Sequence, residues 1–157
     1  MTINKLKRST WIKVFGIMIV AIILGLSPIW AEYEKPIGEN SLPAQAKTFL
    51  QQHFPTEKIA FAKEENDYWI RTYEVILSGG VKIEFRRNGE WKKVEAKYGD
   101  VPPAIIPRPI SEYLSRNFPG TTVREIEKKK REYELELSNS LELKFDSQEF
   151  FLTDYDD

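Results

Sequence analysis

The sequence predicts an α+β protein built from two tandem repeats, each with one helix packed on a roughly four-stranded antiparallel sheet. Two segments carry this prediction, LQQHFP at 50–55 and LSRNFP at 114–119, which share a leucine and a Phe-Pro step. Each is followed by alternating apolar and polar residues, the period of a strand with one buried face. An apolar helix stripe packed on an apolar sheet face buries both surfaces.

The helix of the first repeat is expected to begin near Ser41 and to end at Pro55. Ser41 suits an N-cap and Pro43 suits a first turn, whereas Pro55 cannot continue a helix. Between them, one helix face carries Ala46, Phe49, Leu50, His53 and Phe54. The arrangement returns 64 positions later, in Pro107, Ile110, Tyr113, Leu114, Asn117, Phe118 and Pro119.

Strand patterns follow each Phe-Pro step. We expect strands at 58–63, 73–78, 81–85 and from Trp91 in the first repeat, and at 122–127, 133–138, 141–145 and 150–152 in the second. Gly79-Gly80 and Asn88-Gly89 are turn signals between such strands. The basic run 128–131 fits a hairpin tip, and Asp154, Asp156 and Asp157 fit a solvated tail.

The N-terminal segment has the layout of a secretory signal peptide. It has a basic start, an apolar run from Trp11 to Leu26, a helix-breaking Pro28 and a small residue, Ala31. We expect cleavage after Ala31, with Glu32 as the new N-terminus. The alternative is an uncleaved anchor formed by residues 11–29, since about 20 apolar residues span a bilayer. In both cases the folded part is periplasmic or secreted.

The remaining chain is expected to divide in a simple order. After the signal peptide (1–31) come a lead-in (32–41), the first helix-plus-sheet repeat (42–98), a Pro-rich connector (99–109) and the second repeat (110–157). Four prolines make the connector stiff, so we expect it to hold the two repeats in a defined relative placement.

Composition excludes several kinds of function. The chain has no cysteine, which rules out disulfides, a thiol nucleophile and a lipid-modified cysteine anchor. Residues 1–31 contain four basic residues and no acidic one, which leaves 19 basic and 24 acidic residues in the mature part. This net negative charge argues against nucleic acid as a partner.

The repeated motifs resemble a known family. Each copy has a helix ending in Phe-Pro, a Tyr-x-aliphatic-x-Leu strand (73–77, 133–137) and an aliphatic-x-aliphatic-x-Phe strand (81–85, 141–145). With Asn88-Gly-Glu-Trp91, they resemble the exported PepSY-like domains grouped with the β-lactamase-inhibitor protein, over about residues 41–155. The second copy departs from the pattern at the turn 146–149. The resemblance implies a tandem α+β fold that binds or inhibits another protein, and it identifies no contact residue.

No catalytic residue, metal site or cofactor is predicted. His53 is the only histidine and lies on the packing face of its helix, whereas zinc sites usually combine several His or Cys ligands. Glu134, Glu136 and Glu142 alternate with apolar residues, so we expect them on the solvent side of strands. A pair of such carboxylates is also what a hydrolase would use.

Four aromatic residues are candidate binding residues. Tyr68 and Trp69 are expected at a hairpin tip, Trp91 follows an Asn-Gly turn, and Tyr98 ends the first repeat. Trp and Tyr often anchor protein interfaces, although Trp91 also suits the core. The leading hypothesis is an exported non-catalytic module that binds a protein or peptide partner in the envelope or inhibits an extracytoplasmic enzyme. The alternatives are a carboxylate-dependent envelope hydrolase and a sensor domain anchored through residues 11–29.

Overall fold

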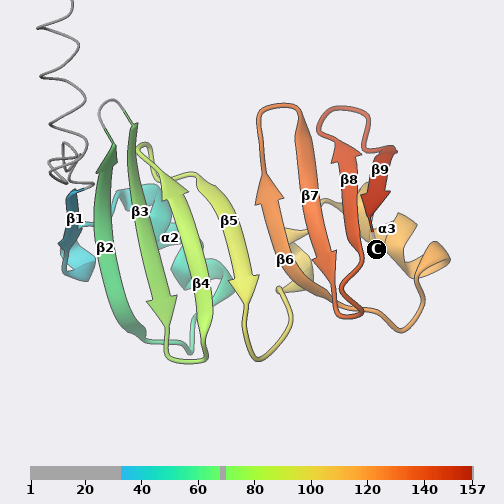
Figure 1. Ribbon diagram of the computed structural model, residues 1–157. Coiled ribbons are helices and arrows are strands. Elements are labelled where there is room, and N and C mark those ends of the chain that lie inside the picture. The colour runs from blue at the N-terminus through green and yellow to red at the C-terminus, as the bar shows by residue number, and fades with distance from the viewer. Residues whose placement is uncertain (1–32, 68–69, 157) are drawn as a thin grey trace, which may run out of the picture. The chain divides into compact units, whose positions relative to one another are not determined.

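The computed structural model describes residues 33–67 and 70–156, which form one nine-stranded antiparallel sheet and two α-helices (Figure 1). The order of strands in the sheet follows the chain: β1 (Tyr33–Pro36), β2 (Ile59–Asp67), β3 (Ile70–Leu77), β4 (Val81–Arg86), β5 (Trp91–Ala96), β6 (Val123–Lys128), β7 (Glu132–Leu137), β8 (Glu142–Asp146) and β9 (Leu152–Asp156). The helices are α2 (Ala44–His53) and α3 (Arg108–Asn117), each preceded by a short 3-10 helix, η1 (Glu39–Ser41) and η2 (Pro103–Ile105). The predicted signal peptide and its cleavage site lie outside the described residues.

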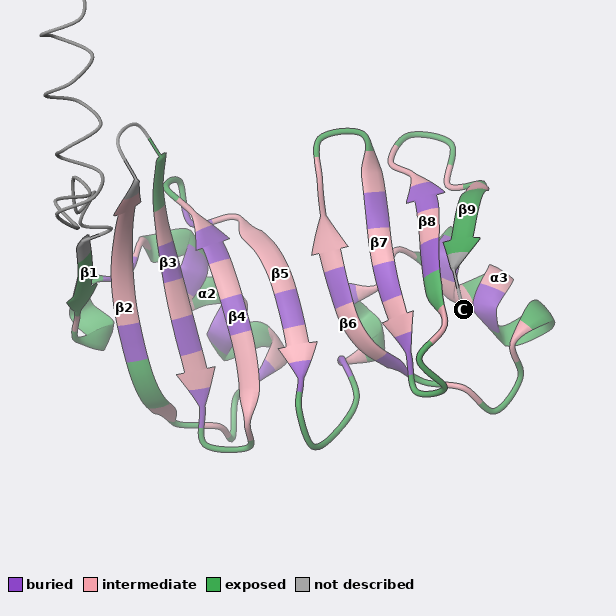
Figure 2. Ribbon diagram, in the orientation of Figure 1, coloured by how far each residue is buried: buried purple, intermediate pink, exposed green. Residues whose placement is uncertain are grey.

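Both helices lie on the same face of the sheet, so the α+β prediction is confirmed (Figure 1). Buried and half-buried residues alternate along the central strands, as the period-two pattern predicts (Figure 2). The fully buried side chains come from both repeats and include Ile83, Phe85, Leu135, Leu143 and Phe145. They form one cluster beneath the two helices.

The sheets of the two repeats join into one, a point on which the sequence pattern was silent. Strand β5 of the first repeat pairs antiparallel with β6 of the second, and Val94 stands opposite Ile126. Both side chains are completely buried. The core is therefore continuous through the junction, which small repeats need because each alone buries little surface.

The two Phe-Pro steps have the same backbone geometry. Phe54 ends α2 with φ −136° and ψ 49°, and Phe118 ends α3 with φ −131° and ψ 56°. In each case the amide N–H donates to the leucine carbonyl four residues earlier, Leu50 or Leu114, at 2.8 Å. The repeat that the sequence predicts is therefore a repeat of structure.

Two expectations were wrong in detail, and a third had left two alternatives open. Ser41 does not cap α2: it ends η1, and Pro43 holds the N-cap position without a side-chain hydrogen bond. The lead-in, which the sequence left as either a linker or an ordered segment, is ordered over residues 33–36, which form β1 against β2. Asp154 is exposed, as a solvated end predicts, but the end is not a tail: residues 152–156 form β9, because Phe150 takes a turn conformation (φ +57°) and delays the strand.

Among the described residues, no helix has both the length and the apolar character that a bilayer crossing requires.

Candidate functional site

The sheet face opposite the helices is charged and is covered by no described element (Figure 1). Its side chains pair across neighbouring strands, with Lys82 Nζ 2.9 Å from Glu95 and Lys93 Nζ 2.7 Å from Glu125. Burial raises the pKa of Glu125, and the nearby carboxylates of Glu95 and Glu136 add to the rise while Lys93 opposes it. These ion pairs join neighbouring strands across a solvent-facing surface.

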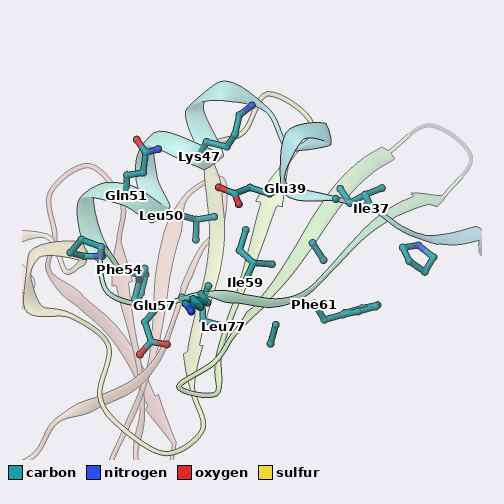
Figure 3. Close-up of a pocket in the computed structure, with 16 residues that line it drawn as sticks. Ile37, Glu39, Lys47, Leu50, Gln51, Phe54, Glu57, Ile59, Phe61 and Leu77 are labelled. Carbon is teal, nitrogen blue, oxygen red and sulfur yellow. The ribbon is translucent and has the colours of Figure 1, made fainter.

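A groove lies on the helix side of the first repeat, between α2, the segment after β1 and the start of β2 (Figure 3). Its volume is about 720 Å³. The side chains of Leu50, Ile59 and Leu77 lie between helix and strand at its floor, together with Phe54. Its polar lining side chains include Glu39, Lys47, Gln51, Glu57 and Lys58. We call this hollow the β2 groove.

The edge of β2 is open beside this groove. Strand β1 pairs only with the later part of β2, from Lys63 to Asn66. The amide of Ile37 then donates to the carbonyl of Ala62 at 2.9 Å. Within the described chain, no strand pairs with Ile59–Phe61 on this side. A strand edge with free backbone groups and an apolar floor beside it can accept an extended chain.

The second repeat contains the equivalent groove in a more closed form. It has a volume of about 500 Å³, and most of its lining residues stand 64 positions after those of the β2 groove. Here the amide of Val101 donates to Val123 at 2.8 Å, at the very start of β6, whereas the equivalent Ile37 bonds three residues further along β2. The connector thus follows the beginning of β6, while the lead-in leaves the beginning of β2 uncovered.

The polar lining of the two grooves also differs. Where the first repeat has Glu39, Lys47, Gln51 and Lys58, the second has Pro103, Ser111, Ser115 and Thr122. The apolar floor is retained, with Leu114 and Val123 at the positions of Leu50 and Ile59. The charges are therefore not required by the repeat itself and distinguish the β2 groove.

One end of the β2 groove is held by Glu57. Its carboxylate accepts hydrogen bonds from the Ser78 hydroxyl and from the Gly79 amide, both at 2.7 Å. These bonds tie the segment after Pro55 to the β3–β4 turn. The first residues of β2 are therefore held in place although none of the described strands pairs with their outer edge.

Of the four predicted binding residues, the two that the structure describes, Trp91 and Tyr98, do not line the β2 groove. Tyr68 and Trp69 lie outside the described residues. Trp91 is half-buried, with its ring 6.2 Å from Phe49 and 6.4 Å from Tyr133, and it lines a separate hollow of about 640 Å³ beside the connector. Tyr98 is 76% exposed. Its ring lies against Gly80, where an added Cβ would be 2.7 Å from the ring.

The groove residues escaped sequence analysis for a physical reason. Leu50, Phe54 and Ile59 carry the same apolar pattern that marks the core, so nothing sets them apart along the chain. The open edge depends on where the lead-in pairs, and a pairing register between distant segments is not written in local residue types. Only the difference between the repeats at positions such as Lys47 and Ser111 could have suggested a specialised surface.

His53 occupies the structural position expected for it. It is half-buried at the end of α2, with its ring 4.6 Å from that of Phe49. Burial lowers its pKa from 6.5. No group of three or more potential metal ligands occurs in the part of the chain that the structure describes.

Comparison with known proteins agrees with the fold. The family described as "Putative beta-lactamase-inhibitor-like, PepSY-like" matches residues 26–72 and 71–153. A protein from Bacteroides vulgatus, described as a "putative periplasmic protein" of the DUF2874 family, is 43% identical with a TM-score of 0.77 over 81% of this chain and 99% of its own. No curated protein matches the chain.

Two further solved structures are similar. A "putative calcium-regulated periplasmic protein" from Bacteroides thetaiotaomicron is 44% identical, with a TM-score of 0.76 over 79% of this chain and 97% of its own. A second Bacteroides vulgatus protein, described as a "putative periplasmic protein of unknown function", is 34% identical, with a TM-score of 0.75 over 80% of this chain and 100% of its own. None of these descriptions assigns a catalytic activity.

Proposed function

The chain belongs to the PepSY-like, β-lactamase-inhibitor-like family, and we propose that it is an exported non-catalytic module that binds an extended segment of a protein or peptide partner. The observation that carries the proposal is the unpaired edge of β2 at Ile59–Phe61 beside the β2 groove. An extended segment gains main-chain hydrogen bonds at such an edge and places alternate side chains in the adjacent hollow.

The groove has features that such a segment needs. Leu50, Phe54 and Ile59 provide an apolar floor for one or two partner side chains. Charged side chains of both signs surround this floor: Lys47 and Lys58 are positive, and Glu39 is negative. Charged groups at a rim mainly set specificity and association rate, whereas the buried centre supplies affinity.

We place the protein in the periplasm or outside the cell. The relatives described as periplasmic support this location, as does the leader at residues 1–31. Mass spectrometry of the exported protein tests the cleavage site. An N-terminus at Glu32 is the expected result, and a protein that retains Met1 would instead favour an anchor at residues 11–29.

The binding proposal is tested with a matched pair of double variants. Lys47→Ser/Lys58→Thr gives the β2 groove the residues of the second groove, and Ser111→Glu/Thr122→Glu changes the equivalent positions of the second groove. Each double variant lowers the net charge by two units. Partners recovered from an envelope extract, and extended peptides derived from them, are measured against both variants and Tyr68→Ala/Trp69→Ala. Because one relative is described as calcium-regulated, each measurement is made with calcium and with a chelator.

The expected result is weaker binding by the β2-groove variant and unchanged binding by its matched control. Hydrogen exchange adds a direct readout, because a bound segment should slow exchange of the amides at 59–61. Equal recovery by the two double variants would overturn the proposed site. Loss of binding only in Tyr68→Ala/Trp69→Ala would move the contact to the β2–β3 connection.

A further inference from the structure

The two repeats end in equivalent strands, β5 and β9, whose outer edges are used differently. Each pairs with the strand before it through the same irregularity, between Glu84 and Phe85 in the first repeat and between Lys144 and Phe145 in the second. The registers make Asp154 the counterpart of Lys93 and Tyr155 the counterpart of Val94. The pairing of β6 with β5 therefore shows how a further strand could pair with the outer edge of β9.

In the first repeat, the outer edge of β5 is filled by β6. Val94 stands opposite Ile126, and both are completely buried. Beside this pair, Lys93 forms an ion pair with Glu125 at 2.7 Å across the two strands. An apolar pair on the helix side and an ion pair on the other side thus hold the added strand.

In the second repeat, the same edge has no neighbour among the described strands, because β9 is the last in the sheet. Tyr155 occupies the position of the buried Val94 and is 63% exposed, and Phe151 just before the strand is 53% exposed. The side chain of Asp154 is 59% exposed although it lies 3.4 Å from Lys144. An acidic residue, Asp156, also follows in the strand.

We propose that the outer edge of β9 binds an extended segment of another protein in which an apolar residue lies between two basic residues, paired antiparallel as β6 pairs with β5. The apolar residue would cover Tyr155, as Ile126 covers Val94. A basic residue would pair with Asp154, in the place where Lys93 has Glu125. Main-chain hydrogen bonds supply the pairing, and side-chain charge selects the segment.

A second copy of this chain does not fit the edge. Two β9 edges brought together would place acidic residues next to one another, which destabilises cross-strand pairs. The other end of the sheet is β1, a strand of four residues that ends in Pro36, and its Glu34 already pairs with Lys63 at 2.9 Å. The acidic edge thus discourages self-association and accepts a basic strand.

This inference goes beyond the proposed function, because β9 and the β2 groove lie at opposite ends of the strand order. The test uses the whole mature protein and three blocked seven-residue peptides. One has Lys-Val-Lys at its centre, one has Glu-Val-Glu, and one has Lys-Val-Lys with alternate backbone nitrogens methylated. Fluorescence anisotropy measures affinity, and NMR shifts of backbone amides report the location.

The Lys-Val-Lys peptide is expected to bind and to shift amides of β9, and the other two peptides are expected to bind at least about tenfold more weakly. Asp154→Lys should weaken binding about tenfold, whereas Glu149→Lys, the same charge change on the adjacent exposed turn, should not. Tyr155→Ser should also weaken binding. Circular dichroism and thermal melting confirm that each variant is folded.

The proposal is overturned if the Lys-Val-Lys peptide does not bind, if the acidic peptide binds equally well, or if Asp154→Lys and Glu149→Lys have the same effect. The groove variant Lys47→Ser/Lys58→Thr should leave this binding unchanged. Failure of the β9 proposal would therefore be distinguishable from failure of the β2 groove.

Discussion

The ring of Phe49 meets the ring of Phe85 edge-on, with centroids 5.7 Å apart and planes at 82°. The equivalent pair, Tyr113 and Phe145, repeats this contact at 5.4 Å and 79°. Each contact joins the helix of a repeat to its third long strand, β4 or β8. Because edge-on packing is a preferred geometry of aromatic pairs, it fixes the position of the helix on the sheet.

Replacing Phe145 with alanine should destabilise the protein by about 3–5 kcal/mol, the usual cost of removing a fully buried phenylalanine. Because β5 and β6 join the two sheets, unfolding should remain a single transition. Urea denaturation followed by circular dichroism and by tryptophan fluorescence measures both properties. The mature tryptophans, Trp69 and Trp91, belong to the first repeat, so separate transitions in the two signals would show that the repeats unfold independently.

Lys63 should hold β1 against the sheet. Its Nζ lies 2.9 Å from Glu34, 2.6 Å from Glu65 and 3.6 Å from Glu74. Its hydrogen bonds with Glu65 and Glu34 raise its pKa. This stabilisation is therefore fully present below pH 10.5 and is lost as the pH rises through the higher folded-state pKa.

Lys63→Met should cost about 1 kcal/mol and increase hydrogen exchange of residues 33–36. Lys82→Met is the control, since Lys82 also lies on the open face but pairs with Glu95, away from β1. Unchanged exchange of residues 33–36 in Lys63→Met would show that backbone pairing alone holds β1.

Two turn residues should respond in opposite directions to substitution. Gly89 has φ +86°, and a Cβ there would lie 2.8 Å from Pro43 Cβ and 3.0 Å from the Ala46 amide. Gly89→Ala should therefore destabilise by more than about 1 kcal/mol. Ser140 has φ +66°, so Ser140→Gly should stabilise by about 0.5–1 kcal/mol. Thermal melting measures both, and equal effects of the two substitutions would contradict the backbone argument.

Stability should fall on mild acidification because of His53. Burial lowers the pKa of His53 from 6.5, so the unfolded state takes up a proton at a higher pH than the folded state. The loss begins as the pH falls through 6.5 and stops below the folded-state pKa. Denaturation between pH 7 and pH 5 compares the wild type with His53→Gln, for which this part of the pH dependence should disappear. A variant with the same pH dependence as the wild type would assign the effect to other groups.

Local pattern was sufficient for both helices and for the strands from β2 to β8. The apolar stripes that end at Phe54 and Phe118 predict helices, and the alternation at Tyr133–Leu137 predicts a strand. These patterns are readable because an apolar side chain marks a position that is buried in the core. The strand β9 was placed too early, because Phe150 adopts a positive φ that its residue type does not suggest. The β1 strand was missed, because it is short, polar and exposed and depends on its partner β2.

The sequence by itself determined the repeat, the helix and strand types and the hydrophobic face of each element, because these follow from the spacing of apolar residues and from Gly and Pro. Only the tertiary structure decided that β5 and β6 join the sheets, and that no strand of the described chain pairs with the outer edge of Ile59–Phe61 or with the outer edge of β9 at Tyr155. These features depend on which distant segments pair and in what register. The pairing and its register depend on the free energy of the whole sheet, so they cannot be predicted from any single segment.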